Sequence, residues 1–379
     1  MTDKLLKLYI EPSSRCNLAC KMCFRNTWID ESFSDMDMSV FRNTIDTMPE
    51  SVRTVFFGGM GEPLVHESIL SMVEYAANKG VRVELLTNGT LLTREMSAAL
   101  LDKGLNMLWV SLDSIDEGEY EKIRINSNYR LVKSNIEAFN AERDKRQNTV
   151  EWIESEVERA SLGLAFVAMK SNVRQLGRLN RFAFTHGVSE INVSNISPTD
   201  RESQNESLCS RTVSLGLGAE GSGNPRINLP AMDSNVENVR DGLMSLFTAD
   251  FDYSPAGSET LARRRRYCRF INEGIAFVRH DGDVSPCIAL LHTGVTYLFD
   301  NRRVVSHHSF GNTGTHSLAD IWESEEYSAF RTRVKEFDFS PCVQCGGCDN
   351  RDENLADCFG NTKPTCGACL WSEGVLSCP

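Results

Sequence analysis

Three cysteines within eight residues, Cys16, Cys20 and Cys23, constrain this chain more than any other feature of its sequence. Thiolates at this C-x3-C-x2-C spacing can surround one metal centre, and a [4Fe–4S] cube needs four ligands. The motif supplies three, so one iron would stay open to a substrate or cofactor, much as catalytic zinc keeps a non-protein position. The spacing by itself fits a zinc knuckle or buried structural cysteines equally well, and the rest of the chain has to separate these interpretations.

Length, charge and cysteine content narrow the class of protein. The chain has 379 residues, a net charge of −12 and 41% hydrophobic residues, enough for one large domain and a smaller one. The acidic balance argues against nucleic-acid binding, and no apolar run is long enough for a membrane span. Without a signal peptide after Met1 we expect a cytoplasmic protein, where structural disulfides are rare. The 13 cysteines therefore indicate metal binding.

Short β-branched runs alternate with amphipathic stretches over the first two hundred residues, the pattern of repeated βα units around a parallel sheet. Strands are predicted at 5–11, 53–57, 81–86, 107–112, 162–169 and 190–193. Six such units predict an α/β fold of the partial (β/α)6, TIM-like barrel type. In parallel barrels the chemistry lies at the carboxyl ends of the strands, so the residues that follow each strand are the candidates for a site.

A glycine-rich segment follows the second predicted strand and contains Gly58, Gly59, Gly61 and Glu62. Glycines allow a ligand to come close to the backbone, and this run offers amides and carbonyls to a zwitterion. A tight turn is the plainer interpretation of the same residues.

Polar side chains follow the other strands. Ser111 and Asp113 end the fourth strand and Arg124 follows it; hydroxyl and carboxylate groups suit ribose hydroxyls, and a guanidinium suits a carboxylate. Taken singly, Asp113 is also explained as a helix cap and Arg124 as half of a surface ion pair. Asn88 after the third strand and Asn195 after the sixth are equally compatible with loop turns.

These motifs, in this order over residues 5–200, resemble the radical S-adenosylmethionine (SAM) superfamily. The resemblance implies that Cys16, Cys20 and Cys23 hold a [4Fe–4S] cluster whose open iron chelates the methionine moiety of SAM, and that an electron passed to SAM releases a 5′-deoxyadenosyl radical. Met22 is a small departure, because an aromatic residue commonly precedes the last cysteine. The implied SAM-binding residues are Met22, Gly58, Gly59, Gly61, Glu62, Asn88, Ser111, Asp113, Arg124 and Asn195.

The middle of the chain is less informative. Residues 129–159 are charge-rich and predict a solvated helix. From 201 to 262 the composition shifts to Ser, Asn and Gly, which predicts a linker or insertion, and Cys209 within it is expected to bind no metal. Arg263 to Arg266 directly precede Cys268 and fit either an exposed helix face or an anion contact.

Nine cysteines lie after residue 267, and their context resembles the SPASM extension of radical SAM enzymes. Cys268, a G-x4-C turn ending at Cys287, a Gly311-Asn312 turn and a Trp-containing helix predicted at 317–333 precede a compressed cysteine group. The resemblance implies a small SPASM-like iron–sulfur domain at 263–379, after a radical SAM core at 1–200 and an insertion at 201–262. The implied ligands of one or two auxiliary [4Fe–4S] clusters are Cys268, Cys287, Cys342, Cys345, Cys348, Cys358, Cys366, Cys369 and Cys378.

Zinc remains an alternative in this tail. Two C-x2-C pairs, Cys342 with Cys345 and Cys366 with Cys369, are separated by twenty residues, which is also the spacing of a zinc ribbon.

Longer strings at both ends, among them 8–12, 23–28, 57–63, 345–349 and 366–371, resemble the radical SAM maturases of tungsten-cofactor oxidoreductases. This implies a protein or pterin-cofactor substrate and an electron donor such as ferredoxin or flavodoxin. Radical modification of a ribosomally made peptide is an alternative, although no recognition domain precedes Lys4. An iron–sulfur carrier without radical chemistry is a second alternative, and the nucleotide-site pattern argues against it.

Overall fold

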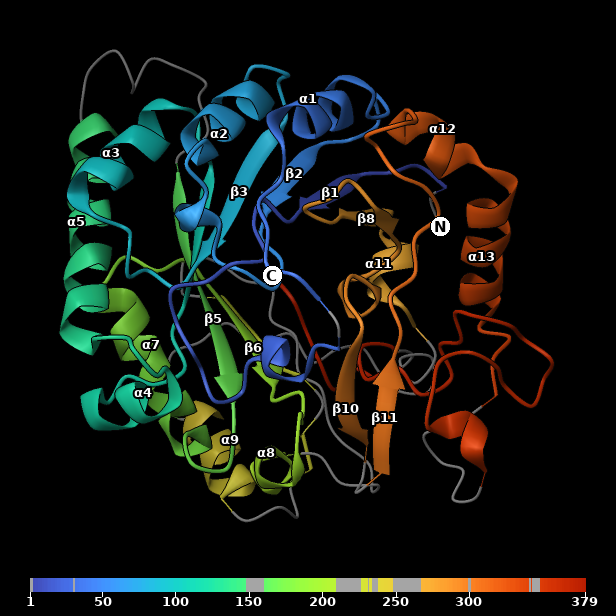
Figure 1. The fold of residues 1–379 in the computed structure, drawn as a ribbon. Helices are drawn as coiled ribbons and strands as arrows, with labels where there is room; N and C mark the ends of the chain where they lie inside the picture. The colour runs from blue at the N-terminus through green and yellow to red at the C-terminus, as the bar shows by residue number, and fades with distance from the viewer. Residues whose placement is uncertain are drawn as a thin grey trace.

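The computed structural model of the protein describes residues 3–29, 31–147, 160–208, 226–230, 232–233, 238–247, 267–298, 301–340, 342 and 348–379 (Figure 1). The predictions made for residues 148–159, for Cys209, for Arg263 to Arg266 and for Cys345 lie outside these described residues.

All six predicted strands are present. They are β1 (Lys7–Ile10), β2 (Thr54–Phe57), β3 (Arg82–Thr87), β4 (Met107–Ser111), β5 (Ser161–Ala168) and β6 (Glu190–Asn195). Each pairs in parallel with the next strand along the chain. Parallel neighbours need a crossover connection, and helices supply most of these crossovers, so the βα interpretation of the sequence is confirmed.

The sheet extends beyond the six predicted strands. Its order is β7-β6-β5-β4-β3-β2-β1-β8-β9. β7 (Arg226–Asn228) pairs in parallel with β6, and β8 (Ile275–Val278) pairs in parallel with β1. β9 (Val284–Ser285) is antiparallel to β8, and β10 (Gly294–Leu298) forms a separate hairpin with β11 (Asn301–Val305). The cysteine-rich tail therefore begins on the same sheet as the core.

Helices cover the outer side of the sheet in Figure 1. The α-helices are α1 (Met38–Asp46), α2 (Ile69–Ala77), α3 (Arg94–Asp102), α4 (Glu117–Ile123), α5 (Tyr129–Gln147), α7 (Leu176–Thr185), α8 (Arg201–Asn205), α9 (Val239–Phe247), α11 (Arg269–Asn272), α12 (Leu318–Glu323) and α13 (Glu325–Glu336). Short 3-10 helices are η1 (Phe24–Thr27), η2 (Pro63–Val65), η3 (Val173–Gln175), η4 (Ile288–Leu290) and η5 (Asp349–Arg351). None of the described helices is both long and apolar enough to cross a lipid bilayer.

The helix predicted at 317–333 is two helices. Ser324 lies between α12 and α13, and its side chain accepts a hydrogen bond from the amide of Tyr327. A serine in this position satisfies an amide that the first turn of a helix leaves without a partner. A second helix start inside the predicted span is therefore the physical reason for the break.

The inner face of the barrel carries an aromatic row. Tyr9 lies between Phe56 of β2 and Phe277 of β8, with both ring centroids 4.4 Å away. Phe57 instead contacts Phe41 of α1 on the outer face, because successive side chains of a strand point to opposite faces.

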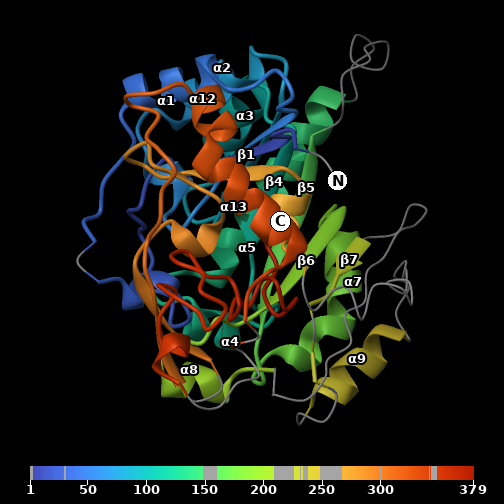
Figure 2. The same cartoon turned by 90° about the vertical axis from the view of Figure 1, so that its right-hand side faces the viewer.

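The last residues of the chain lie against this inner face. The amide of Ser377 donates to Ser194 Oγ on β6 at 3.1 Å, and the Tyr9 hydroxyl donates to the carbonyl of Pro379. Figures 1 and 2 accordingly place the C-terminus near the centre of the molecule. The cysteine-rich tail thus both adds strands β8 and β9 to the sheet and fills part of the barrel.

Candidate active site

The loop that carries Cys16, Cys20 and Cys23 follows β1 and is tied to two other strand ends. The amide of Lys21 donates to the carbonyl of Ile123 at the end of α4 at 3.0 Å, and the amide of Ala19 donates to that of Ile125 just beyond it at 3.2 Å. From the other side, the amide of Glu62 donates to the carbonyl of Arg15 at 2.8 Å. The motif is therefore held between the end of β2 and the end of α4.

The three thiols are half-buried and affect one another electrostatically. Burial raises the pKa of Cys20 to about 11, against the opposing effect of Arg124, and burial also raises the pKa of Cys23. The Cys16 sulfur accepts from the amide of Leu18 at 3.4 Å and from Asn88 Nδ2 at 3.7 Å. Donors aimed at a sulfur tune an iron–sulfur cluster that it binds, so this arrangement suits cluster ligands.

The glycine-rich segment packs directly beneath the cysteine loop. A Cβ on Gly61 would stand 2.0 Å from the carbonyl oxygen of Ser13 and 2.7 Å from that of Arg15. Only glycine permits this approach, because real Cβ atoms do not come so close to backbone. The backbone of the segment is thereby held against the loop that precedes Cys16.

Replacing Gly61 with Ala is expected to destabilise the protein by about 1–3 kcal/mol, the usual cost of forcing extra atoms into a packed site. Gly118→Ala is the matched control: its Cβ would meet only Asp116 Oδ1, at 3.6 Å, within α4. Alanine inside a helix gains up to about 1 kcal/mol over glycine. Anaerobic thermal unfolding of both variants measures the difference, and equal melting temperatures would contradict the close packing.

Glu62 is buried and its carboxylate already has three protein donors. Oε1 accepts from Thr87 Oγ1 at 2.6 Å and from the amide of Leu64 at 3.1 Å, and Oε2 accepts from the amide of Asn88 at 2.7 Å. Burial raises the pKa of Glu62, and these hydrogen bonds oppose the rise. The side chain joins the ends of β2 and β3; a direct contact between it and SAM stays a prediction.

Asp113 and Arg124 form a buried ion pair, with Arg124 Nη2 2.7 Å from Asp113 Oδ2. The cap of α4 is Asp116, so neither plainer interpretation from the sequence describes these two residues. The other carboxylate oxygen accepts from the amide of Val167 at 2.9 Å. Arg124 Nε is buried without a hydrogen-bond acceptor among the described residues, and a buried donor of this kind fits a bound ligand.

The remaining predicted residues line the carboxyl ends of β4, β5 and β6. Ser111 is half-buried at the last position of β4. Met22 packs with Ile123, Met169 and Ile196, an apolar group beside the cysteine motif. Asn195 lies at the end of β6 and donates through Nδ2 to the carbonyl of Val375 at 2.8 Å.

Four tail cysteines form one electrostatically linked group. Burial raises the pKa of Cys268 to about 12 and also raises those of Cys287, Cys366 and Cys369. For Cys268, Cys287 and Cys366, the largest contribution to the raised pKa after burial is the negative charge of the Cys369 thiolate. Buried thiols with raised pKa values keep their protons unless a metal displaces them, so this group fits a metal centre with four thiolate ligands.

The other described tail cysteines differ from one another in exposure and in hydrogen bonding. Cys342 is buried, whereas Cys348 and Cys358 are exposed. The Cys378 sulfur accepts from Trp371 Nε1 at 3.4 Å, and the carbonyl of Cys378 accepts from Arg269 at 2.6 Å.

The spacing of these sulfurs disfavours zinc. Zn–S bonds of about 2.3 Å place tetrahedral ligand sulfurs about 3.8 Å apart. In the described part of the chain, the one group of three or more potential ligand atoms lying within 4.8 Å of one another contains no cysteine. The described cysteine sulfurs therefore stand further apart than the ligands of one bound zinc ion, and Cys345 of one C-x2-C pair lies outside the described residues.

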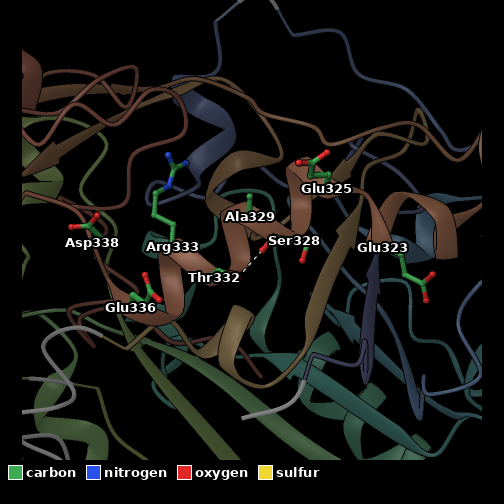
Figure 3. Close-up of a pocket in the computed structure, with 8 residues that line it drawn as sticks. All are labelled: Glu323, Glu325, Ser328, Ala329, Thr332, Arg333, Glu336 and Asp338. Carbon is green, nitrogen blue, oxygen red and sulfur yellow. Dashed lines mark hydrogen bonds between the residues drawn. The ribbon is translucent and has the colours of Figure 1, made fainter.

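A surface hollow along α13 is unrelated to these residues. Figure 3 shows Glu325, Ser328 and Arg333 among the side chains that line it, and none of its eight lining residues belongs to the predicted site.

Comparison with known proteins assigns the class. The profile of the radical SAM superfamily matches residues 10–150, and that of the SPASM iron–sulfur cluster-binding domain matches residues 268–349. The chain belongs to the radical SAM superfamily and carries a SPASM domain. It is a radical SAM enzyme that binds SAM and [4Fe–4S] clusters, as its sequence predicted; when bound, they supply a 5′-deoxyadenosyl radical by reductive cleavage of SAM.

Two relatives match nearly the whole chain. One is the "Tungsten-containing aldehyde ferredoxin oxidoreductase cofactor-modifying protein" of Pyrococcus furiosus, with 32% identity over 98% of this chain and 96% of that one. The other is the "PqqA peptide cyclase" of Bradyrhizobium diazoefficiens, with 25% identity over 98% and 88%.

Solved structures confirm the fold. SuiB of Streptococcus suis bound to SAM superposes with a TM-score of 0.55 at 17% identity, covering 91% of this chain and 71% of that one. The SAM-bound anSMEcpe also gives 0.55 at 17% identity, covering 92% and 87%.

Three buried residues near the site escaped the sequence analysis: Glu11, His280 and His292. Glu11 follows β1, His280 follows β8 and His292 precedes β10, so no local spacing links the three residues. His280 begins the turn that presents Cys287, and this was the only signal that could have drawn attention to it.

Proposed function

We propose that this enzyme matures a tungsten-containing oxidoreductase by modifying its pterin-based cofactor or the protein that holds it. The supporting observation is the 32% identity to a cofactor-modifying protein over 98% of the chain. That similarity runs through both iron–sulfur regions, so it reaches beyond the SAM-binding core that many radical SAM enzymes share.

In this proposal Cys16, Cys20 and Cys23 hold the SAM-binding cluster. Arg124 holds the methionine carboxylate, and Asp113 keeps its guanidinium in place through the 2.7 Å ion pair. Glu62 positions the loop whose backbone meets SAM, because its carboxylate is bonded to the end of β3. The other proposed SAM contacts are Met22, Gly58, Gly59, Gly61, Asn88, Ser111 and Asn195.

The tail would hold two auxiliary clusters. Cys268, Cys287, Cys366 and Cys369 are proposed to bind the first, since burial raises the pKa of each thiol and Cys369 acts electrostatically on the other three. Cys342, Cys345, Cys348 and Cys358 are left for the second. Cys378 is proposed as the spare cysteine, because the groups that act most strongly on its pKa, besides burial, are Trp371, Arg269 and Lys7 rather than another thiol.

The proposed partners follow from this chemistry. A protein or pterin cofactor is the substrate, and a ferredoxin or flavodoxin donates the electron. The acidic charge of −12 argues against a nucleic-acid partner, and the 13 cysteines suit the reducing cytoplasm.

Peptide modification is the second candidate, supported by the 25% identity to a peptide cyclase over the same length. The two candidates differ in what stimulates SAM cleavage. The test incubates the reconstituted enzyme with SAM and dithionite. One reaction also contains the tungsten oxidoreductase apoprotein with its pterin cofactor, and the other contains a precursor peptide.

We expect 5′-deoxyadenosine formation to rise several-fold only with the oxidoreductase, together with a mass change in the cofactor or protein. The Cys20→Ala enzyme is the control for uncatalysed change. A mass change in the peptide alone would contradict the maturation proposal and favour the alternative.

A further inference from the structure

A compact group of two histidines and one carboxylate lies beside the proposed SAM site. Glu11, His280 and His292 are 1%, 7% and 0% exposed. Glu11 Oε2 is 3.1 Å from His280 Nδ1 and 2.8 Å from His292 Nε2, and one ligand atom from each residue lies within 4.8 Å of the others. Charged and ionisable side chains are rarely buried this completely without a partner that requires them.

These distances match the geometry of metal coordination. Bonds of about 2.1 Å from a divalent ion to imidazole nitrogen and carboxylate oxygen place neighbouring ligand atoms about 3.0 Å apart at right angles and about 3.4 Å apart in a tetrahedron. The observed 2.8 and 3.1 Å lie at the right-angle value. Two histidines and a carboxylate grouped on one side of an ion leave its other positions open.

Glu31 decides how the protons of His292 are arranged. Its Oε2 lies 3.2 Å from His292 Nδ1, while His292 Nε2 faces Glu11. A neutral imidazole has one N–H, so without a metal only a doubly protonated His292 can donate to both carboxylates. With a metal, a neutral His292 is enough: its Nε2 lone pair binds the ion while Nδ1–H lies beside Glu31 Oε2.

The surroundings also resemble a metal site's supporting shell, in which a carboxylate orients a ligating histidine. Glu31 is held by the amide of Thr293 at 3.0 Å and by Arg279 at 3.7 Å. The Trp28 ring stacks on His292 at 3.9 Å between centroids. The second oxygen of Glu11 accepts from the amide of Met60 at 2.9 Å, which ties the group to the glycine-rich segment.

We propose that Glu11, His280 and His292 bind one divalent transition-metal ion, separate from the iron–sulfur clusters. This ligand set is typical of zinc and of non-haem iron(II), and manganese(II) also accepts it. Because Glu11 contacts the glycine-rich segment, the ion would border the space where SAM and substrate meet. Its open positions would take water or an oxygen-donor group of the substrate. The proposal does not depend on which substrate is modified.

Manganese binding tests the proposal in the full-length, reconstituted enzyme. With the clusters oxidised and EPR-silent, loss of the six-line signal of free Mn²⁺ measures binding directly. We expect one Mn²⁺ per chain, displaced by Zn²⁺. We further expect Glu31→Gln to weaken binding by about 10- to 100-fold, as loss of a partner to a ligating histidine does, and His292→Gln to abolish it.

His316→Gln is the matched control, because His316 is exposed and lies outside the group. Iron content and the melting temperature show whether each variant has folded. Two results would overturn the proposed metal site. One is a folded wild-type enzyme that binds neither Mn²⁺ nor Zn²⁺, and the other is equal Mn²⁺ binding by the folded wild type and folded His292→Gln. Either result would assign His292 instead to a buried imidazolium between Glu11 and Glu31. Both results are independent of SAM cleavage, so they leave the proposed function to its own test.

Discussion

Replacing Cys20 with Ala is expected to abolish 5′-deoxyadenosine formation and to lower the iron content from about twelve to about eight per chain. Cys20 is one of three thiolates in the motif, and a cluster with an open iron has no spare protein ligand. The two remaining cysteine ligands, Cys16 and Cys23, are not expected to retain the SAM-binding cluster. The tail clusters use other cysteines in our assignment, so their iron should remain.

Two measurements test this expectation. The first is the iron and zinc content per chain after anaerobic reconstitution, and the second is the 5′-deoxyadenosine formed from SAM with dithionite. Cys378→Ala is the matched control, because Cys378 is proposed to be the spare cysteine of the tail; this variant should keep about twelve irons. Undiminished SAM cleavage by Cys20→Ala would contradict the assignment of the motif. Zinc in the tail with about four irons in the wild type would contradict the auxiliary clusters.

Replacing Arg124 with Met is expected to lower the free energy of unfolding by about 3–5 kcal/mol, the usual cost of breaking a buried ion pair from one side. The Asp113 carboxylate is fully buried and would lose the charge 2.7 Å away. The same change should weaken SAM binding by roughly tenfold to a hundredfold, since a charge-assisted hydrogen bond contributes about 1.5–3 kcal/mol.

Arg130→Gln provides the comparison, because Arg130 pairs with Glu117 at 2.8 Å but their side chains are 80% and 42% exposed. Exposed pairs contribute at most about 1 kcal/mol. Anaerobic urea unfolding and calorimetric SAM titration measure both effects. Equal stability of the two variants would show that the Asp113–Arg124 pair is not a buried, coupled unit, and unchanged SAM affinity in folded Arg124→Met would remove Arg124 from the cofactor site.

The predicted strands agree with the structure because each depends on a local pattern. A run such as 107–112 is apolar at every position but Ser111, and β4 (Met107–Ser111) follows from that run without reference to distant residues. The cysteine motif is equally local, since three thiols in eight residues restrict the possible metal centres wherever the chain places them. The break at Ser324 was missed because a single serine cap between two helix-forming stretches is a weak local signal.

Sites built from residues far apart in the sequence could not be predicted from local patterns. Asp113 and Arg124 were predicted separately as SAM-binding residues, and a cap and a surface ion pair explained them equally well when taken singly, because their sequence contexts say nothing about burial. The tertiary structure makes them a buried pair and ties Asp113 to the amide of Val167 on β5. Likewise, no pattern joins Cys268 and Cys287 to Cys366 and Cys369 rather than to Cys342.

The amino-acid sequence by itself determined the family, the six barrel strands and the cysteine motif of this enzyme, because each is written in short-range spacing. Only the tertiary structure brought Glu11 to His280 and His292, which lie 269 and 281 residues further along the chain. The physical reason is the pairing of β8 with β1: backbone hydrogen bonds align Ile10 with Val278, and the residues just beyond both strand ends then meet.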